Sequence, residues 1–280
     1  FKDVILTTFG DLMRVPGTET SLQKEKAEGC DIRVVYSTMD AIELAVTYPE
    51  KKIVFLGIGF ETTAPTIAAA IQTARQMGLK NFSVFSAHKT VPPALQALMS
   101  MENVQVDGFL LPGHVSLIIG RDAYKPFFKR FKTPCAIAGF EPADILQAVL
   151  LLVRQIETAS PELANAYGRA VTDKGNPTAE KLMRDTFEIK DVAWRGIGVI
   201  PGSGMKINAD LGAYDAERQF SIELPVSQDP KGCACGDILT GIKQPFECPL
   251  DKTRCTPMDP VGPCMVSSEG TCAAYYKYHG

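Results

Sequence analysis

The sequence contains no long apolar run, no excess of positive charge and no nucleotide-binding loop. Its longest apolar run, residues 148–153, is far shorter than the roughly 20 residues that a membrane-spanning helix requires. Lysine and arginine number 29 against 32 aspartate and glutamate residues, so the chain lacks the basic surface that nucleic acids and anionic membranes attract. Neither a G-x-G-x-x-G fingerprint nor a P-loop indicates a dinucleotide or ATP site. We therefore expect no nucleic acid and no membrane among the partners of this protein.

Most of the chain alternates short apolar segments with amphipathic ones. This order is typical of parallel sheets whose strands are joined by crossover helices, so we predict an α/β fold with two Rossmann-like open-sheet units. The first unit is predicted over residues 1–106, with strands at 4–8, 32–36, 53–57 and 82–86 and helices at 39–47, 63–76 and 93–101. The second is predicted over residues 107–226, with strands at 108–111, 135–138 and 197–200 and helices at 144–156 and 178–187.

Six of the eight cysteines lie in the last sixth of the chain. They are Cys233, Cys235, Cys248, Cys255, Cys264 and Cys272. From residue 227 onward, glycine, proline and cysteine recur every few residues, and no periodic segment is long enough to bury an apolar face by itself. We therefore predict a small irregular C-terminal iron-sulfur domain over residues 227–280. Of the other two cysteines, Cys135 lies in an apolar strand pattern and is predicted to be a buried thiol.

Four of the clustered cysteines are predicted to hold a [4Fe-4S] cluster. Thiolate is the soft ligand that iron in a sulfide cage prefers, and four thiolates complete the usual ligand set. Gaps of 12, 6 and 16 residues separate the predicted ligands Cys235, Cys248, Cys255 and Cys272. Cys233 is the alternative to Cys235 and lengthens the first gap to 14 residues. Cys264 is then left over, and its role stays open.

Zinc, disulfides and a redox-active thiol pair are other interpretations of the same cysteines. A structural zinc site usually shows paired C-x2-to-4-C knuckles, whereas the closest pair here, Cys233 and Cys235, is separated by one residue. Disulfides require an oxidising compartment, and no segment of the sequence suggests export. A cysteine that is not a cluster ligand is also able to exchange with the thiol of a partner. The spacing alone leaves these alternatives open.

Polar, glycine-rich motifs follow four predicted strands, at the sheet edge where ligands of open α/β sheets bind. These motifs are residues 8–17, 59–65, 112–116 and 139–144. Two of them contain a Phe-Glu step ahead of a helix, whose carboxylate either caps the helix or faces a cleft. A cleft between the two units is predicted to handle a proton or a polar ligand and to be lined by Arg14, Glu61, Thr62, Thr63, His114 and Glu141. His88 lies in a further motif, residues 87–93, and is interpreted as a structural histidine.

These motifs, in this order, resemble those of the HypD family of [NiFe]-hydrogenase maturation factors. The resemblance rests on the four motifs above, on Cys255-Thr256-Pro257 and on residues 264–270, and it spans essentially the whole chain. It implies a cytoplasmic, redox-active assembly scaffold rather than a conventional turnover enzyme. Two similar α/β domains and a C-terminal [4Fe-4S] domain are implied with it.

The resemblance also implies a reaction and partners. Proteins of this family assemble the Fe(CN)2CO unit of the hydrogenase active site with a HypC-type chaperone, and they receive cyanide from a HypE-type enzyme. The cluster would then supply electrons through a thiol pair to a transiently held iron with CN and CO ligands. Under this resemblance, the family's central cleft contains Glu61, Thr62, Thr63, His114 and Glu141.

The family carries two further cysteine motifs ahead of the segment that opens this sequence. One is of the Cys-Gly-Gly-His type and the other is Gly-Pro-Gly-Cys-Pro-x-Cys, and neither occurs here. We therefore expect an N-terminally truncated chain. Two alternative functions are a ligand-binding α/β enzyme with a structural zinc module, and an interaction module that docks a partner without chemistry.

Overall fold

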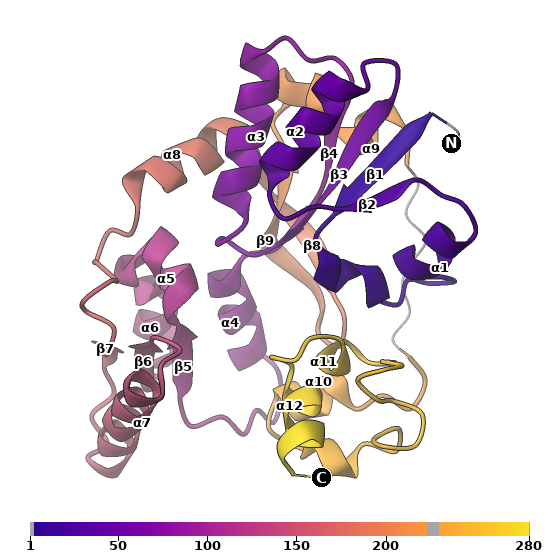
Figure 1. Cartoon of the computed structure of the whole chain (residues 1–280). Coiled ribbons are helices and arrows are strands. Elements are labelled where there is room, and N and C mark those ends of the chain that lie inside the picture. Colours follow the sequence, from indigo (N-terminus) through magenta and orange to yellow (C-terminus); the bar gives the residue numbers. More distant parts are fainter. Residues whose placement is uncertain (1–2, 223–229, 280) are drawn as a thin grey trace.

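The structure, a computed structural model, describes residues 3–222 and 230–279 and confirms the predicted α/β fold (Figure 1). Its first unit is a parallel sheet of order β2-β1-β3-β4, with bounds β1 Val4–Thr8, β2 Ile32–Val34, β3 Lys52–Gly59 and β4 Phe82–His88. The helices between these strands are α1 Leu22–Ala27, α2 Thr38–Thr47 and α3 Ala64–Gln76, with a 3-10 turn η1 at Gly10–Arg14. None of the helices in the described part of the chain combines the length and apolar character that crossing a bilayer requires.

Apolar side chains of β1, β3 and β4 pack against α2 and α3 to form the core of the first unit. Ile5, Phe55 and Phe82 are fully buried there. The sequence also sets where α2 begins, because Ser37 and Asp40 form a capping box that satisfies the free amides of the first turn. The apolar strand pattern and the helix cap therefore explain why the strands and α2 form where they do.

The side chain of Asn81 ties the end of α2 to the start of β4. Its amide nitrogen donates to the backbone carbonyls of Ala45, Tyr48 and Lys51 at 2.8, 3.2 and 3.1 Å. Asn81→Ala is expected to lower the free energy of unfolding by about 2 kcal/mol, because half-buried carbonyls lose their donor. Urea denaturation followed by circular dichroism measures this loss. Gln76→Ala, which removes an exposed amide at the end of α3, is the control, and an equal loss in both variants would contradict the prediction.

An antiparallel hairpin, β8 Phe187–Trp194 and β9 Gly198–Ile207, lies against β4. Met205 and Ile207 of β9 are buried in the core of the first unit. The chain thus returns to this unit after the second sheet, and α8 packs on α3 (Figure 1). The other elements of this return are α8 Pro177–Thr186, η3 Ala209–Tyr214 and α9 Ala216–Gln219. The strand predicted at 197–200 is the beginning of β9, and it pairs with β8 rather than with the second sheet.

The second unit is a parallel three-stranded sheet of order β5-β6-β7, with bounds β5 Phe109–Pro112, β6 Cys135–Ala138 and β7 Leu163–Asn165. The helices around it are α4 Val91–Met99, α5 Gly113–Ile119, η2 Arg121–Tyr124, α6 Lys125–Phe131 and α7 Pro142–Glu157. Although α4 lies in the range predicted for the first unit, its apolar side chains pack on the core of the second. Cys135 is a fully buried free thiol, as predicted, and burial raises its pKa to about 12.

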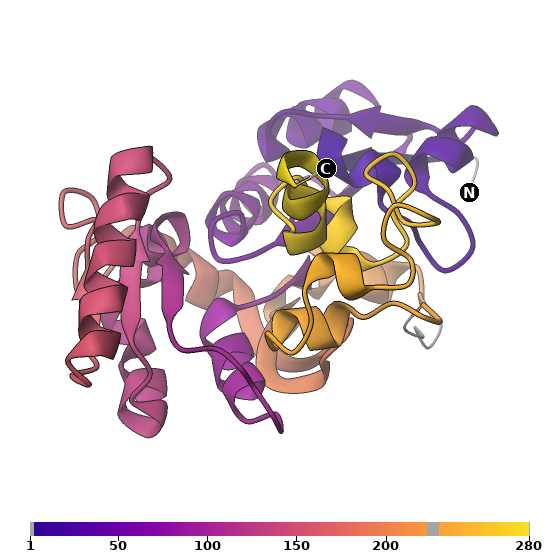
Figure 2. The same ribbon diagram turned by 90° about the horizontal axis from the view of Figure 1, so that it is seen from below.

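The cysteine-rich segment contains only short elements: α10 Cys235–Leu239, η4 Pro245–Glu247, α11 Pro263–Val266 and α12 Thr271–Tyr278. Its apolar core is small and is centred on Cys255, Met265 and Ala273. In Figures 1 and 2 this segment (yellow and orange) lies beside α4, and the Gln105 amide in the loop after α4 donates to the Thr240 carbonyl at 2.8 Å. The predicted boundary between residues 226 and 227 lies outside the described residues. Apolar burial contributes little to this part of the fold.

Candidate functional site

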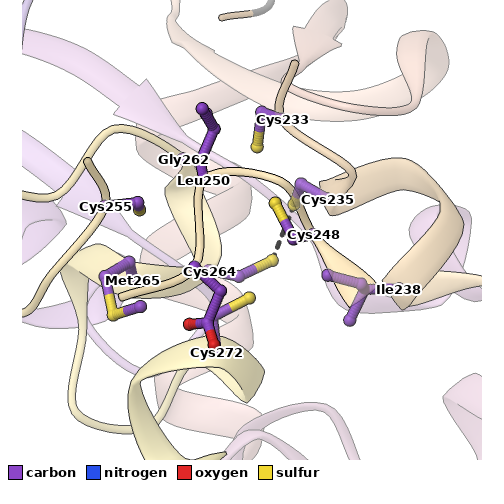
Figure 3. Close-up of a pocket in the computed structure, with 11 residues that line it drawn as sticks. Cys233, Cys235, Ile238, Cys248, Leu250, Cys255, Gly262, Cys264, Met265 and Cys272 are labelled. Carbon is purple, nitrogen blue, oxygen red and sulfur yellow. Dashed lines mark hydrogen bonds between the residues drawn. The ribbon is translucent and has the colours of Figure 1, made fainter. Parts of the chain in front are cut away.

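All six clustered cysteines line one cavity in the C-terminal segment (Figure 3). Three short helices each contribute one of them: α10 provides Cys235, α11 provides Cys264 and α12 provides Cys272. The other walls are largely apolar and include Ile238, Leu250, Gly262 and Met265. The segment therefore folds around a space lined by sulfur.

Three of the thiols interact directly. The sulfur atoms of Cys235 and Cys264 lie 2.6 Å apart. Hydrogen bonds with Cys235 and Cys272, together with burial, raise the pKa of the Cys264 thiol, and the bond with Cys264 lowers the pKa of Cys272. Burial raises the pKa of Cys233 to about 11. Cys264, which the sequence leaves without a role, thus lies between two predicted ligands.

The surroundings of the cavity were compared with what an iron-sulfur cluster requires of its ligands. In the described residues, no three His, Cys, Asp or Glu side chains converge on a position for one metal ion. In a [4Fe-4S] cage each thiolate binds a different iron, so the ligands surround a volume rather than a point. The Val261 amide donates to Cys255 Sγ at 3.3 Å, and such bonds stabilise a charged thiolate. Soft donors, apolar walls and an amide donor together fit an iron-sulfur cluster.

The turn between β8 and β9 connects the cysteine-rich segment with the predicted cleft. The Trp194 ring lies 6.0 Å from the Phe60 ring, and the Lys89 ammonium lies 4.7 Å from the Trp194 ring centroid. Two residues further along, Gly196 has a φ of 78° and packs against Gly236 of α10. A Cβ on Gly236 would lie 2.7 Å from the Gly196 carbonyl oxygen, so this close approach requires glycine. The turn therefore fixes α10 relative to the first unit.

Glu61 is a buried carboxyl at the junction of the two units. Its side chain is 3% exposed, and Oε1 accepts the Val91 amide at 2.9 Å. It thus caps α4 rather than α3, the helix that it precedes in sequence. Burial raises the pKa of Glu61 to about 7, and Oε2 has no hydrogen-bond partner among the described residues. Glu61 is therefore able to hold or release a proton near neutral pH.

His114 and Glu141 lie in the second unit. The His114 ring is 4.8 Å from the Phe140 ring, and burial lowers the pKa of His114 against the opposing charge of Glu269 in the cysteine-rich segment. Glu141 is exposed and forms an ion pair with Arg169 at 2.9 Å. The charge of Glu269 therefore favours the protonated form of His114, while burial opposes it.

The remaining predicted cleft residues are on the first unit. Thr62 and Thr63 lie in the turn ahead of α3, and the Thr63 hydroxyl donates to the Phe60 carbonyl at 3.2 Å. Arg14 is exposed at the end of η1. Within the described part of the chain, no hydrogen bond or ion pair joins Glu61 to Arg14, His114 or Glu141. The predicted cleft residues are thus a set of separate polar groups and not one hydrogen-bonded site.

Sequence reasoning missed the partner of the 139–144 motif. Arg169 donates from its two terminal nitrogens to Asp144 Oδ1 and Oδ2 at 2.5 and 2.6 Å, and its guanidinium lies 4.6 Å from the Tyr167 ring. Asp144 is buried, and the bidentate bond with Arg169 lowers its pKa. The residues Tyr167-Gly168-Arg169, which follow β7 after one alanine, were the available signal. This pair fixes the loop that carries Glu141.

Gly139→Ala is expected to lower the free energy of unfolding by about 2 kcal/mol, because an added methyl overpacks this loop. A Cβ at Gly139 would contact Asp144 Oδ2 and would lie 2.8 Å from Tyr167 Cε2. Thermal unfolding followed by circular dichroism measures the loss. Gly168→Ala is the matched control, since nothing lies within 4 Å of its added methyl, and equal shifts in both variants would argue against the steric explanation.

Comparison with known proteins gives one family and close relatives. The HypD family, described as "Hydrogenase formation hypA family", matches residues 1–279. Hydrogenase maturation factor HypD2 of Bradyrhizobium diazoefficiens is 48% identical over 285 residues, which cover 99% of this chain and 75% of that protein. Hydrogenase maturation factor HypD of Escherichia coli is 46% identical over 278 residues, or 99% of this chain and 74% of that protein. HypD of Azotobacter vinelandii is also 46% identical, over 98% of this chain and 74% of its own.

Proposed function

The chain belongs to the HypD family of hydrogenase formation proteins, and from this premise we propose that it is an iron-sulfur scaffold for assembly of a hydrogenase Fe(CN)2CO centre. The observation that carries the proposal is the cavity lined by six cysteines in a segment with little apolar packing of its own. The relatives are named hydrogenase maturation factors, which supports a role in the same process. The cytoplasm is the proposed location.

We propose that a [4Fe-4S] cluster occupies the cysteine cavity. Its ligands are Cys248, Cys255 and Cys272 with either Cys235 or Cys233. When bound, such a cluster supplies single electrons. The contact between Cys235 and Cys264 supports the set with Cys233, because it leaves these two thiols side by side as a dithiol. In that arrangement Cys264 is not a ligand of the cluster but one of the two thiols of the neighbouring dithiol.

In the proposed cleft, side chains of this chain handle protons and polar ligands. Glu61 holds a proton near neutral pH, since burial raises its pKa to about 7. His114 is neutral there because burial lowers its pKa, and its Nδ1 has no partner among the described residues. Thr62 and Thr63 supply hydroxyl groups, and Glu141 supplies a carboxylate whose position depends on Arg169.

The proposed partners are a HypC-type chaperone and a HypE-type cyanide-transfer protein. Iron with CN and CO ligands is then a transient cargo of the scaffold rather than a resident cofactor. The family supports these partners. The scaffold would work by positioning and by redox chemistry.

Anaerobic reconstitution of the chain with iron and sulfide tests the proposal. We expect about four irons and four sulfides per chain, together with a broad thiolate-to-iron absorbance near roughly 400 nm and a paramagnetic signal on reduction. One zinc without sulfide would overturn it in favour of a ligand-binding α/β enzyme with a structural zinc module. A second result would favour a simple interaction module. In that case a variant without the cluster would capture a HypC-type protein as well as the parent chain does, and neither protein would show redox activity.

A further inference from the structure

One carboxylate lines the cysteine cavity together with the sulfur atoms (Figure 3). Among the described residues that form the walls of this cavity, Asp251 is the single acidic or basic one, and all the others are cysteine, glycine or apolar residues. Its Oδ1 atom is buried although the residue as a whole is half-buried. A negative charge is therefore built into a wall that otherwise consists of sulfur and apolar groups.

The loop between Cys248 and Cys255 holds Asp251 at the cavity through its backbone. The Asp251 amide donates to the Cys248 carbonyl at 3.0 Å, and the Cys255 amide donates to the Leu250 carbonyl at 2.9 Å. Asp251 also forms a β-bridge with Cys255. These contacts place Asp251 between two proposed cluster ligands, and a change of its side chain leaves them in place.

The charge of Asp251 also acts on a third proposed ligand, Cys272 at the start of α12. The hydrogen bond with Cys264 lowers the pKa of Cys272, while burial and the charges of Cys235 and Asp251 act in the opposite direction. The Asp251 carboxylate is therefore close enough to the Cys272 sulfur to oppose negative charge on it. Cys248, Cys255 and Cys272 belong to both proposed ligand sets, so Asp251 adjoins the cluster whichever set is correct.

No cation offsets this charge within the part of the chain that the structure describes, where Asp251 forms no ion pair. Lys243, the basic residue that follows α10, is paired with Asp237 at 2.5 Å. Lys252 and Arg254 lie in the same loop as Asp251 but are exposed, so solvent and salt screen their charges. The field of Asp251 at the cavity is therefore largely uncompensated.

We propose that the Asp251 carboxylate lowers the reduction potential of the cluster without being one of its ligands. Reduction adds one electron, and thus one negative charge, to a centre that its thiolates already make anionic. A fixed negative charge nearby opposes this step, more strongly in a cavity with apolar walls than in water. A lower potential makes the reduced cluster a stronger one-electron donor. The inference rests on the cluster proposed above and assigns its potential to one residue.

Asp251→Asn tests this role, because it removes the charge and nearly preserves the shape. Parent chain and variant are reconstituted anaerobically and titrated with dithionite in the presence of mediator dyes, and the reduced cluster is measured by electron paramagnetic resonance. At one ambient potential, the ratio of reduced to oxidised cluster is expected to rise at least about tenfold in Asp251→Asn, a shift of about 59 mV for one electron. Iron and sulfide contents are expected to match those of the parent chain.

Two further variants separate the charge from other effects of substitution. Asp251→Glu keeps the carboxylate and is expected to stay much closer to the parent potential than Asp251→Asn. Asp259→Asn is the matched control, since Asp259 is exposed in the same segment and does not line the cavity. It is expected to leave the ratio unchanged.

The possible failures are distinguishable. A parent chain that takes up no cluster would overturn the function proposed above and this inference with it. A full cluster with the same potential in the parent chain and in Asp251→Asn would overturn only the role of Asp251. Loss of the cluster from Asp251→Asn would also overturn that role, because the carboxylate would then be required for assembly of the cluster and not for its potential.

Discussion

Glu61→Gln is expected to stabilise the protein by about 3 kcal/mol above roughly pH 8 and to leave its stability unchanged near pH 4. Burial raises the pKa of Glu61 from 4.5 to about 7. The unfolded chain therefore loses this proton first as the pH rises, and the folded state must later give it up from a buried site. Stability falls between pH 4.5 and about 7 in the parent chain, whereas glutamine has no proton to lose.

Urea denaturation of the parent chain and of Glu61→Gln at several pH values measures this difference. Glu157→Gln, at the exposed end of α7, is the control and should follow the parent at every pH. His88 acts in the opposite direction, because burial lowers its pKa from 6.5 to about 4 and stability is lost as the pH falls through this range. That acid-side loss should remain in Glu61→Gln. Parallel curves for the parent chain and Glu61→Gln would refute the buried-carboxyl account.

Parallel strands of both sheets were predictable because they carry local signals. The predicted bounds 4–8 and 135–138 coincide with β1 and β6, which are short apolar runs between polar or turn residues. The β8–β9 hairpin was not predicted as a hairpin, since β8 is half exposed and carries charged residues at positions 188, 190 and 191. Its position on β4 depends on contacts with residues about 100 positions earlier, which sequence periodicity does not report.

The sequence identified the groups of the candidate site but not their pairing. Clustering of six cysteines predicted a common site, and all six line one cavity. Spacing did not predict that Cys264 lies against Cys235, because this contact depends on how α10 and α11 pack. In the same way, Glu61 was placed before α3 by sequence, while its role as a cap of α4 follows from the packing of the two units.

Cys255→Ser is expected to remove the cluster, whereas Cys264→Ser is expected to retain it. Cys255 belongs to both proposed ligand sets, is buried and accepts the Val261 amide, so its loss leaves an iron without its thiolate. Cys264 belongs to neither set, and its thiol interacts with Cys235 and with Cys272. Iron and acid-labile sulfide, measured after identical anaerobic reconstitution, should fall to near zero in the first variant and stay near about four each in the second. Cys30→Ser, an exposed cysteine outside the cavity, is the control and should keep both.

Cys233→Ser and Cys235→Ser then decide the fourth ligand, because the two ligand sets differ only at these positions. If Cys235 forms the dithiol with Cys264, Cys233→Ser loses iron and sulfide, while Cys235→Ser keeps both and loses one reactive thiol. The opposite result assigns Cys235 to the cluster and leaves Cys233 outside it. Retention of a full cluster in both variants would contradict a ligand set that contains either cysteine. Since serine replaces a single atom of cysteine and its hydroxyl oxygen is a poor ligand for iron in a sulfide cage, a change in metal content reports ligand chemistry.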